Sequence, residues 1–427
     1  MRLLRVASRI LRIVRKVLGL LILAALLGRD GIELEGPVER VRLFTRKLEF
    51  EFVGWTLGAA EVKLGQWSLG ATAYLREDDR RSVPLEYLKL VREGSDLESQ
   101  LAEIYADPNL HEPAQAAAPV ARKLDEVRRE EEAVQPATES IMQEMIAFVL
   151  GDLGLNLGGT AFPPVAFRFS PLPVALIVSP REAIRQDANL QLHPDLVLED
   201  QIQLEKNVER SLGVSALVVA IGGIGTYPTM VQESTDLVWL FEVVAHEWVH
   251  NYLTLRPLGL NYDTSQELRT MNETVASILG KEIGRRVLEV YYPELIPAPA
   301  PEPAAAPAPD EPQPFDFRSE MRETRVTVDR LLADGRIDEA EAYMEERRQF
   351  FWQNGYRHIR RINQAYFAFY GTYSDQPGGA AGDDPVGEAV RMLRARIQSP
   401  AKFLRTMAWM DEFSDLLKTL EEMSTPD

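Results

Sequence analysis

Two histidines and a glutamate in the segment FEVVAHEWVHNYL, residues 241–253, are the side chains best suited to chemistry. His246 and His250 are four residues apart, so on a helix they share one face and both imidazoles can reach a single metal ion. Glu247 lies about 100° further round such a helix, where its carboxylate can accept a proton from water that the metal activates. This H-E-x-x-H spacing predicts a zinc-binding helix. The alternative is a buried histidine pair or a closed structural site.

A catalytic zinc ion needs three protein ligands and an open fourth position, so one more ligand is expected downstream. Glu273 lies 23 residues beyond His250, in the segment MNETVASILGKEIG, residues 271–284, which has a helical pattern. A second helix that crosses the first can bring this carboxylate to the metal. The alternative is an ordinary acidic residue near the start of a helix, where the helix dipole stabilises it.

The composition limits the other kinds of site. The 427 residues include five histidines and no cysteine, so thiolate metal sites, disulfide bonds and cysteine nucleophiles are excluded. The formal net charge of −18 argues against general binding to nucleic acid, which requires a basic surface. Hydrophobic residues make up 45% of the chain, enough for a packed core, so a globular protein is expected.

The combination of H-E-x-x-H with Asn272-Glu273-Thr274-Val275-Ala276 resembles the gluzincin metallopeptidases. It is similar in particular to a bacterial family classed as aminopeptidases, in which an N-E-x-x-A segment follows the first motif. Those proteins also carry a segment like N-N-A-x-L-x-x-x-x-x-Y, and NQAYFAFYGTY, Asn363 to Tyr373, is similar to it. The resemblance covers about residues 237–284 and 347–373. It implies a peptidase of aminopeptidase type with Zn²⁺ on His246, His250 and Glu273.

A tyrosine is the candidate for a further catalytic group. Peptide hydrolysis places negative charge on the carbonyl oxygen, and a donor beyond the metal is expected to stabilise it. Tyr373 ends the segment that resembles the family. Glu247 and Tyr373 are therefore the two predicted catalytic residues. Tyr366 and Tyr370 are close in sequence, and an alternative is that all three are core aromatics.

Two departures from related patterns affect the assignment. Thermolysin-like proteins have an aspartate four residues after the ligand glutamate, where this chain has Ser277, so the metal-bound histidine must be oriented by another group. The G-x-M-E-N motif that holds a free α-amine in one large aminopeptidase family is absent. Aminopeptidase activity is therefore implied by the resemblance alone.

The segment VVAIGGIGTYPTMV, residues 218–231, precedes the predicted zinc helix. Its glycines permit close approach of another backbone, and Pro228 suits an edge strand. An extended peptide substrate could add to such an edge through main-chain hydrogen bonds. The alternative is a glycine-containing loop with no role in substrate binding.

The pattern of the whole chain predicts an α+β fold that is predominantly helical. A small mixed sheet is expected to pack on two zinc-bearing helices, with helical additions at the N- and C-terminal ends. Strands are expected at Val165–Val178 and Ser215–Ile224. Helices are expected at Pro84–Ala106, Val120–Ala133, Thr138–Leu153, Asp200–Leu212, Leu237–Leu255, Gln266–Val290, Val386–Ile397 and Ala401–Met423, and over nearly all of Phe317–Phe369. Residues 112–119 (EPAQAAAP) are expected to be a linker.

Five regions follow from these patterns. They are a membrane-targeting segment (1–30), a helical N-terminal region (31–160), a gluzincin catalytic core (161–296), a Pro/Ala-rich linker or insertion (297–314) and a helical C-terminal region (315–427) that completes the active site.

The first region combines a basic helical face, with six Arg or Lys among the first sixteen residues, with the uncharged run Val17–Gly28. An uncleaved membrane anchor or interfacial helix is the favoured interpretation. A cleaved signal peptide and an amphipathic helix packed on the protein are the alternatives. If the segment inserts, the catalytic body is expected outside the cytoplasm, and a cytoplasmic location is the alternative.

Taken together, the sequence predicts a membrane-associated zinc peptidase that acts on a peptide or protein and does not bind nucleic acid. The substrate's identity and length are left open. A membrane-associated zinc endopeptidase and a non-catalytic pseudo-peptidase scaffold are the alternatives to an aminopeptidase.

Overall fold

The computed structural model describes residues 36–69, 75–106, 110–296, 315–376 and 378–424. The predicted membrane-targeting segment, residues 1–30, and the Pro/Ala-rich stretch, residues 297–314, lie outside the described residues. Among the helices that are described, none has both the length and the apolar character needed to cross a bilayer.

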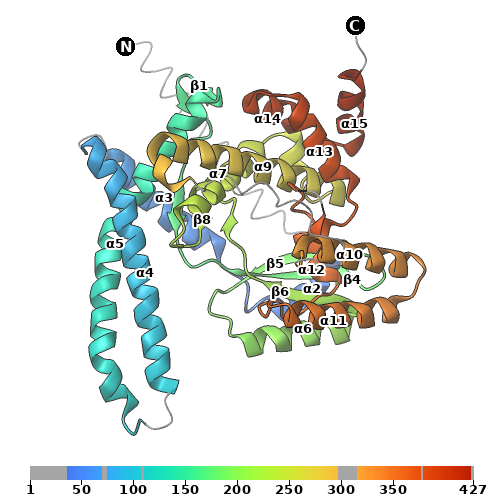
Figure 1. Ribbon diagram of the computed structural model, residues 1–427, viewed down its shortest axis with the longest axis horizontal. Coiled ribbons are helices and arrows are strands. Elements are labelled where there is room, and N and C mark those ends of the chain that lie inside the picture. The colour runs from blue at the N-terminus through green and yellow to red at the C-terminus, as the bar shows by residue number, and fades with distance from the viewer. Residues whose placement is uncertain (1–35, 70–74, 107–109, 297–314, 377, 425–427) are drawn as a thin grey trace, which may run out of the picture.

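Helices make up most of the described chain, and three small sheets accompany them (Figure 1). The prediction of a predominantly helical α+β fold is therefore confirmed. The helices are α2 (Pro37–Thr45), α3 (Phe52–Leu69), α4 (Glu77–Ala106), α5 (Pro113–Asp152), α6 (Leu198–Leu212), α7 (Leu237–Leu253), α8 (Pro257–Leu260), α9 (Gln266–Tyr291), α10 (Phe317–Ala333), α11 (Ile337–Gln353), α12 (Gln364–Tyr370), α13 (Pro385–Arg396), α14 (Pro400–Ala408) and α15 (Phe413–Glu422). The strands are β1 (Asn156–Leu157), β2 (Thr160–Ala161), β3 (Phe167–Phe169), β4 (Val174–Pro180), β5 (Ala188–Leu192), β6 (Val214–Val219), β7 (Gly223–Ile224) and β8 (Thr229–Val231).

The largest sheet is antiparallel throughout, with the order β5–β4–β6. Because side chains alternate along a strand, β4 contributes to two cores. Leu176 and Val178 face a core that includes residues of α2 and α6, whereas Ala175 and Ile177 face Ala365 and other residues of α12. Helices α10 and α11 pack in turn against α12. This sheet therefore supports the helix that precedes Tyr373.

The second sheet is mixed and lies next to α7. Strand β3 is parallel to β8, β8 is antiparallel to β7, and β7 is an edge strand. The predicted single mixed sheet is thus two three-stranded sheets, because the chain leaves the antiparallel sheet after β6 and turns into β7 beside α7. A hairpin of β1 and β2 forms the third sheet.

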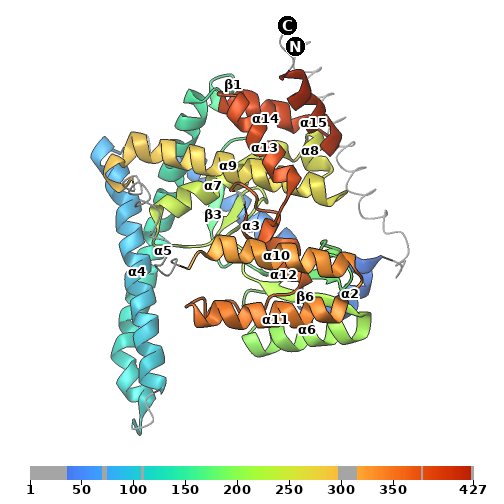
Figure 2. The ribbon, with the colours of Figure 1, turned by 45° about the vertical axis from the view of Figure 1, so that its right-hand side comes forward.

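Helices α4 and α5 form a long hairpin that extends away from the rest of the molecule (Figures 1 and 2). The prediction of a linker at residues 112–119 is wrong, since α5 runs unbroken from Pro113 to Asp152. Pro113 occupies the first turn, where no backbone donor is needed, and the neighbouring alanines favour helix. Leu124 and Val127 of α5 then pack on Leu97 of α4, which stabilises the long helix.

One other predicted helix is interrupted, and the segment predicted to be almost entirely helical is divided into several helices. Residues 401–423 form α14 and α15, because Glu412 and Asp415 make a capping box that begins a new helix. The segment Phe317–Phe369 contains three helices, and a turn with Gly335 at φ +71° separates the first two. Such a turn is typical of a helix end at glycine.

A buried ion pair joins α3, α5 and β3. Lys63 Nζ lies 2.5 Å from Glu139 Oε2, and both side chains are 1% exposed. Glu139 Oε1 accepts hydrogen bonds from the Phe169 amide at 2.9 Å and from Gln135 Nε2 at 2.8 Å. Burial lowers the pKa of Lys63, and the charge of Glu139 opposes that effect. The pair therefore connects β3, and with it the mixed sheet, to the N-terminal helices.

We predict that Lys63→Met lowers the free energy of unfolding by about 3–5 kcal/mol, because it leaves the Glu139 carboxylate buried without its cation. Lys63→Met combined with Glu139→Gln should recover most of that loss, since an uncharged amide can still accept the Phe169 hydrogen bond. Urea denaturation followed by tryptophan fluorescence measures both effects. An equal loss in the single and double variants would contradict a net role for the charge.

Candidate metal centre

Helix α7 carries both candidate histidines and begins at a strong cap. The Asp236 carboxylate accepts hydrogen bonds from the amides of Val238 and Trp239, at 2.9 and 3.1 Å. These are amides that a helix start otherwise leaves without partners. The apolar side of α7 is buried in the main core, and His246 and His250 line a cavity of about 280 Å³.

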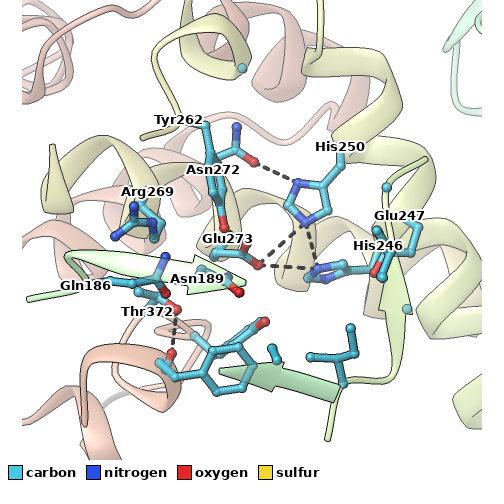
Figure 3. Close-up of a pocket in the computed structure, with 18 of the residues that line it drawn as sticks. Gln186, Asn189, His246, Glu247, His250, Tyr262, Arg269, Asn272, Glu273 and Thr372 are labelled. Carbon is cyan, nitrogen blue, oxygen red and sulfur yellow. Dashed lines mark hydrogen bonds and ion pairs between the residues drawn. The ribbon is translucent and has the colours of Figure 1, made fainter. Parts of the chain in front are cut away.

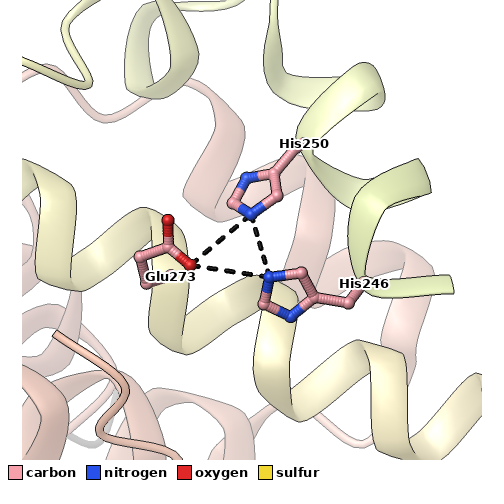
Figure 4. Close-up of side chains that lie close together, drawn as sticks. All are labelled: His246, His250 and Glu273. Carbon is pink, nitrogen blue, oxygen red and sulfur yellow. Dashed lines mark hydrogen bonds and ion pairs between the residues drawn. The ribbon is translucent and has the colours of Figure 1, made fainter. Parts of the chain in front are cut away.

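Three ligand-type atoms form a small triangle at one wall of this cavity (Figure 4). Nε2 of His246 and Nε2 of His250 are 3.0 Å apart. Each of them lies 3.5 Å from Glu273 Oε2. Zinc bonds of about 2.0–2.1 Å in tetrahedral geometry separate neighbouring ligand atoms by about 3.3 Å. The triangle therefore has the size that one zinc ion requires.

The burial, hydrogen bonding and pKa of the Glu273 carboxylate also fit a bound cation. Its Oε2 is buried and accepts no hydrogen bond, which is costly for a carboxylate oxygen. Burial raises the pKa of Glu273, but His250 and His246 outweigh burial and hold that pKa well below its usual value. Burial lowers the pKa of His250, but the Glu273 carboxylate outweighs it and raises that pKa to about 9. Metal binding thus requires His250 to lose a proton.

A second layer of side chains orients the triangle (Figure 3). Nδ1 of His250 lies 2.8 Å from Asn272 Oδ1, an acceptor, so Nδ1 keeps its proton and Nε2 is the nitrogen that can bind a metal once His250 is neutral. Asn272 Nδ2 donates to the Leu258 carbonyl at 3.2 Å, which sets the direction of the amide. The Tyr262 hydroxyl donates to Glu273 Oε1 at 2.5 Å. Glu273 therefore has Oε2 available as a single ligand atom.

Glu247 lies between the triangle and strand β7. Its side chain is buried, and it lines the same cavity as the two histidines. A Cβ atom at Gly223 would lie 2.6 Å from Glu247 Oε1, and one at Gly225 would lie 3.1 Å from His250 Cβ. Only glycine lets β7 pass this close to α7. Burial raises the pKa of Glu247, although His250 and His246 oppose it.

Of the three candidate tyrosines, Tyr373 lines the metal cavity, and Tyr366 and Tyr370 are not among its lining residues. The Tyr373 ring centroid lies 6.3 Å from that of His246. Tyr366 and Tyr370 instead contact each other, with ring centroids 4.6 Å apart. Position alone therefore favours Tyr373 as the tyrosine that could contact a ligand at the metal.

The triangle contains the three predicted metal ligands, and within the described parts of the chain no other group of His, Asp and Glu has such an arrangement. Sequence reasoning did not predict roles for Asn272, Tyr262 or Arg269. Arg269 also lines the cavity. Helical spacing could have located Arg269, because it lies one turn before Glu273 on α9. Tyr262 lies in the loop between α8 and α9, where no periodic pattern indicates it.

No family model matches the chain, and no curated protein or solved structure matches it either. The resemblance to gluzincins therefore stays an expectation drawn from the motif residues alone.

We predict that Asn272→Ala weakens zinc binding by about 10- to 100-fold, because His250 loses the acceptor that sets its tautomer and orientation. Competition with a chromogenic chelator measures the affinity. Asn251→Ala is the matched control, since Asn251 lies on α7 and donates to Thr229 Oγ1 at 2.9 Å, away from the triangle. Equal affinities in the wild type and in Asn272→Ala would contradict the assigned orientation.

Proposed function

We propose that the chain is a zinc-dependent peptidase that hydrolyses peptide bonds with water. The observation that carries this proposal is a buried carboxylate, Glu247, next to three ligand atoms spaced for one metal ion, with all four side chains lining one cavity. Three protein ligands leave a tetrahedral zinc ion one open position, which is the arrangement of catalytic zinc sites. Bound zinc would supply Lewis acidity, which polarises a carbonyl group and makes water more acidic.

Two histidines and one carboxylate also bind Fe(II) in oxygenases, so the donor set alone leaves the metal open. Glu247 favours hydrolysis over oxygenase chemistry. A buried acid–base group beside the metal ligands can take a proton from a water molecule that attacks the peptide carbonyl. The chain also lacks cysteine, so the zinc ligands must come from His, Asp or Glu.

Glu247 is the proposed general base and general acid. It accepts one proton from the attacking water as the new carbon–oxygen bond forms. It then donates that proton to the amine nitrogen as the carbon–nitrogen bond breaks. A base works best when its pKa is near the working pH, and burial shifts the pKa of Glu247 upwards in that direction.

Tyr373 is the proposed donor to the carbonyl oxygen. Tyr373 is 37% exposed, and partial desolvation, followed by the charges of Glu273 and Glu247, raises its pKa above the usual value. The phenol therefore keeps its proton and can donate a hydrogen bond to developing negative charge. Strand β7 is the proposed support for the substrate backbone, since Gly223, Ile224 and Gly225 line the cavity and β7 is at the sheet edge.

We predict that Glu247→Gln retains bound zinc and loses peptidase activity by on the order of 10²- to 10⁴-fold, because an amide cannot carry the proton. Metal analysis and the rate of peptide cleavage measure the two properties. Glu242→Gln is the matched control, as Glu242 is a partly buried glutamate of α7 that does not line the cavity. A fully active Glu247→Gln variant would overturn the proposed chemistry.

We predict that Tyr373→Phe lowers kcat by on the order of 100-fold and leaves KM almost unchanged, because the donor acts mainly in the transition state. The ring is preserved, so zinc content should not change. Steady-state kinetics of Tyr366→Phe and Tyr370→Phe provide controls that should stay active. Loss of activity in Tyr370→Phe but not in Tyr373→Phe would mean that the wrong tyrosine is assigned.

A further inference from the structure

Arg269 is a cation built into the wall of the metal cavity. It lies on α9 one turn before Glu273, so both side chains emerge on the same side of that helix (Figure 3). Arg269 is only 6% exposed, yet it lines the cavity together with His246, Glu247 and Glu273. A buried arginine at this place needs partners for its five N–H groups.

The partners of Arg269 leave its guanidinium incompletely satisfied. Nη1 donates to Gln266 Oε1 at 3.2 Å, and Nη2 donates to Asp263 Oδ1 at 2.8 Å. The Asp263 side chain is 79% exposed, so this ion pair is screened by solvent. Nε is buried and has no hydrogen-bond partner. A buried donor without an acceptor is rare, so the hydrogen-bonding capacity of this guanidinium is only partly used by the protein itself.

Packing holds the guanidinium in place. Its Cζ lies 5.5 Å from the ring centroid of Tyr262, the residue that donates to Glu273 Oε1. An arginine held in this way loses little freedom when it binds, and its planar fork matches a carboxylate. The cation is therefore preorganised close to the metal ligands.

The charges around the cavity distinguish between the two ends of a peptide. Glu247 and Glu273 are the carboxylates among its lining residues, and the proposed function uses both of them. No third carboxylate in the described lining is available for an α-ammonium group. Arg269 is the one Arg or Lys in that lining, and the neutral amides of Gln186, Asn189 and Gln191 accompany it. The lining therefore favours a negatively charged group of the substrate.

We propose that Arg269 is a specificity-determining residue that binds a carboxylate of the peptide substrate. This inference rests on the proposed peptidase function and names its substrate class, peptides with a carboxylate close to the bond that is cleaved. That carboxylate is either the C-terminal α-carboxylate or the side chain of Asp or Glu. Both offer the same pair of oxygens to the guanidinium.

The test uses the full-length, zinc-loaded protein and three peptides that share one parent sequence. One peptide has a free C-terminus, the second has a C-terminal amide, and the third has the amide and an internal Glu in place of Gln. The wild type should cleave one of the two carboxylate peptides roughly 10- to 100-fold better in kcat/KM than the neutral amide. Preference for the first identifies the α-carboxylate, and preference for the third identifies the side chain.

Arg269→Met should abolish that preference, mainly through KM, while cleavage of the neutral amide peptide changes little. Arg269→Lys should recover part of it, because lysine keeps the charge but loses the fork. Arg256→Met is the matched control, since Arg256 stacks on Tyr252, with Cζ 3.6 Å from the ring centroid, and is not a lining residue of the cavity.

Two results would overturn the role of Arg269. One is equal cleavage of all three peptides by the wild type. The other is an equal loss for all three in Arg269→Met together with weaker zinc binding, which would make Arg269 a support for Tyr262 alone.

Binding of the same peptides to Glu247→Gln, measured by calorimetry, separates this inference from the peptidase proposal. If the wild type cleaves no peptide but Arg269 still selects carboxylate peptides in binding, the peptidase proposal fails and the role of Arg269 stands. Absence of selection in both binding and cleavage overturns the role of Arg269.

Discussion

The close crossing of α7 and α9 is the contact on which the candidate site depends. A Cβ atom at Gly280 would lie 2.9 Å from His246 Cβ, and one at Gly284 would lie 2.9 Å from the Glu242 backbone nitrogen. Any larger residue would push the helices apart. Glu273 lies about two turns before Gly280 on the same helix, so the separation of the helices sets the distance from its carboxylate to the two imidazoles. A triangle with sides of 3.0 and 3.5 Å is possible only because the backbones touch.

Separate parts of the fold supply the remaining walls of the cavity. The mixed sheet brings β7 over Glu247, where glycine is required, and the antiparallel sheet supports α12, which leads to Thr372 and Tyr373. Of the N-terminal helices, α5 packs directly on α9 and α7 in the main core, and its Glu139 accepts a hydrogen bond from the β3 amide of Phe169. The cavity beside this helix pair thus includes residues of β7, which precedes α7 in the chain, and Tyr373, which lies 100 residues after Glu273.

Local spacing made part of this arrangement predictable. The i, i+4 histidines and the helices around them follow from helical periodicity, and α7 begins at the predicted Leu237. The roles of Tyr262 and Asn272 depend on how α8 and its loop fold back over α9, which no periodic pattern encodes. The predicted linker at residues 112–119 was wrong because proline and alanine are common both in extended spacers and in the first turns of helices. The predictions for residues 1–30 fall outside the described residues.

X-ray absorption at the metal edge of the purified full-length protein, prepared without chelators, tests the central claim most directly. The account predicts a zinc edge and a first shell of nitrogen and oxygen atoms at about 2.0–2.1 Å, including the outer-shell scattering of two imidazoles. Replacing both His246 and His250 by alanine should abolish that shell. An iron edge, a shell without imidazole, or an unchanged spectrum in the double variant would contradict a zinc site at the α7–α9 crossing.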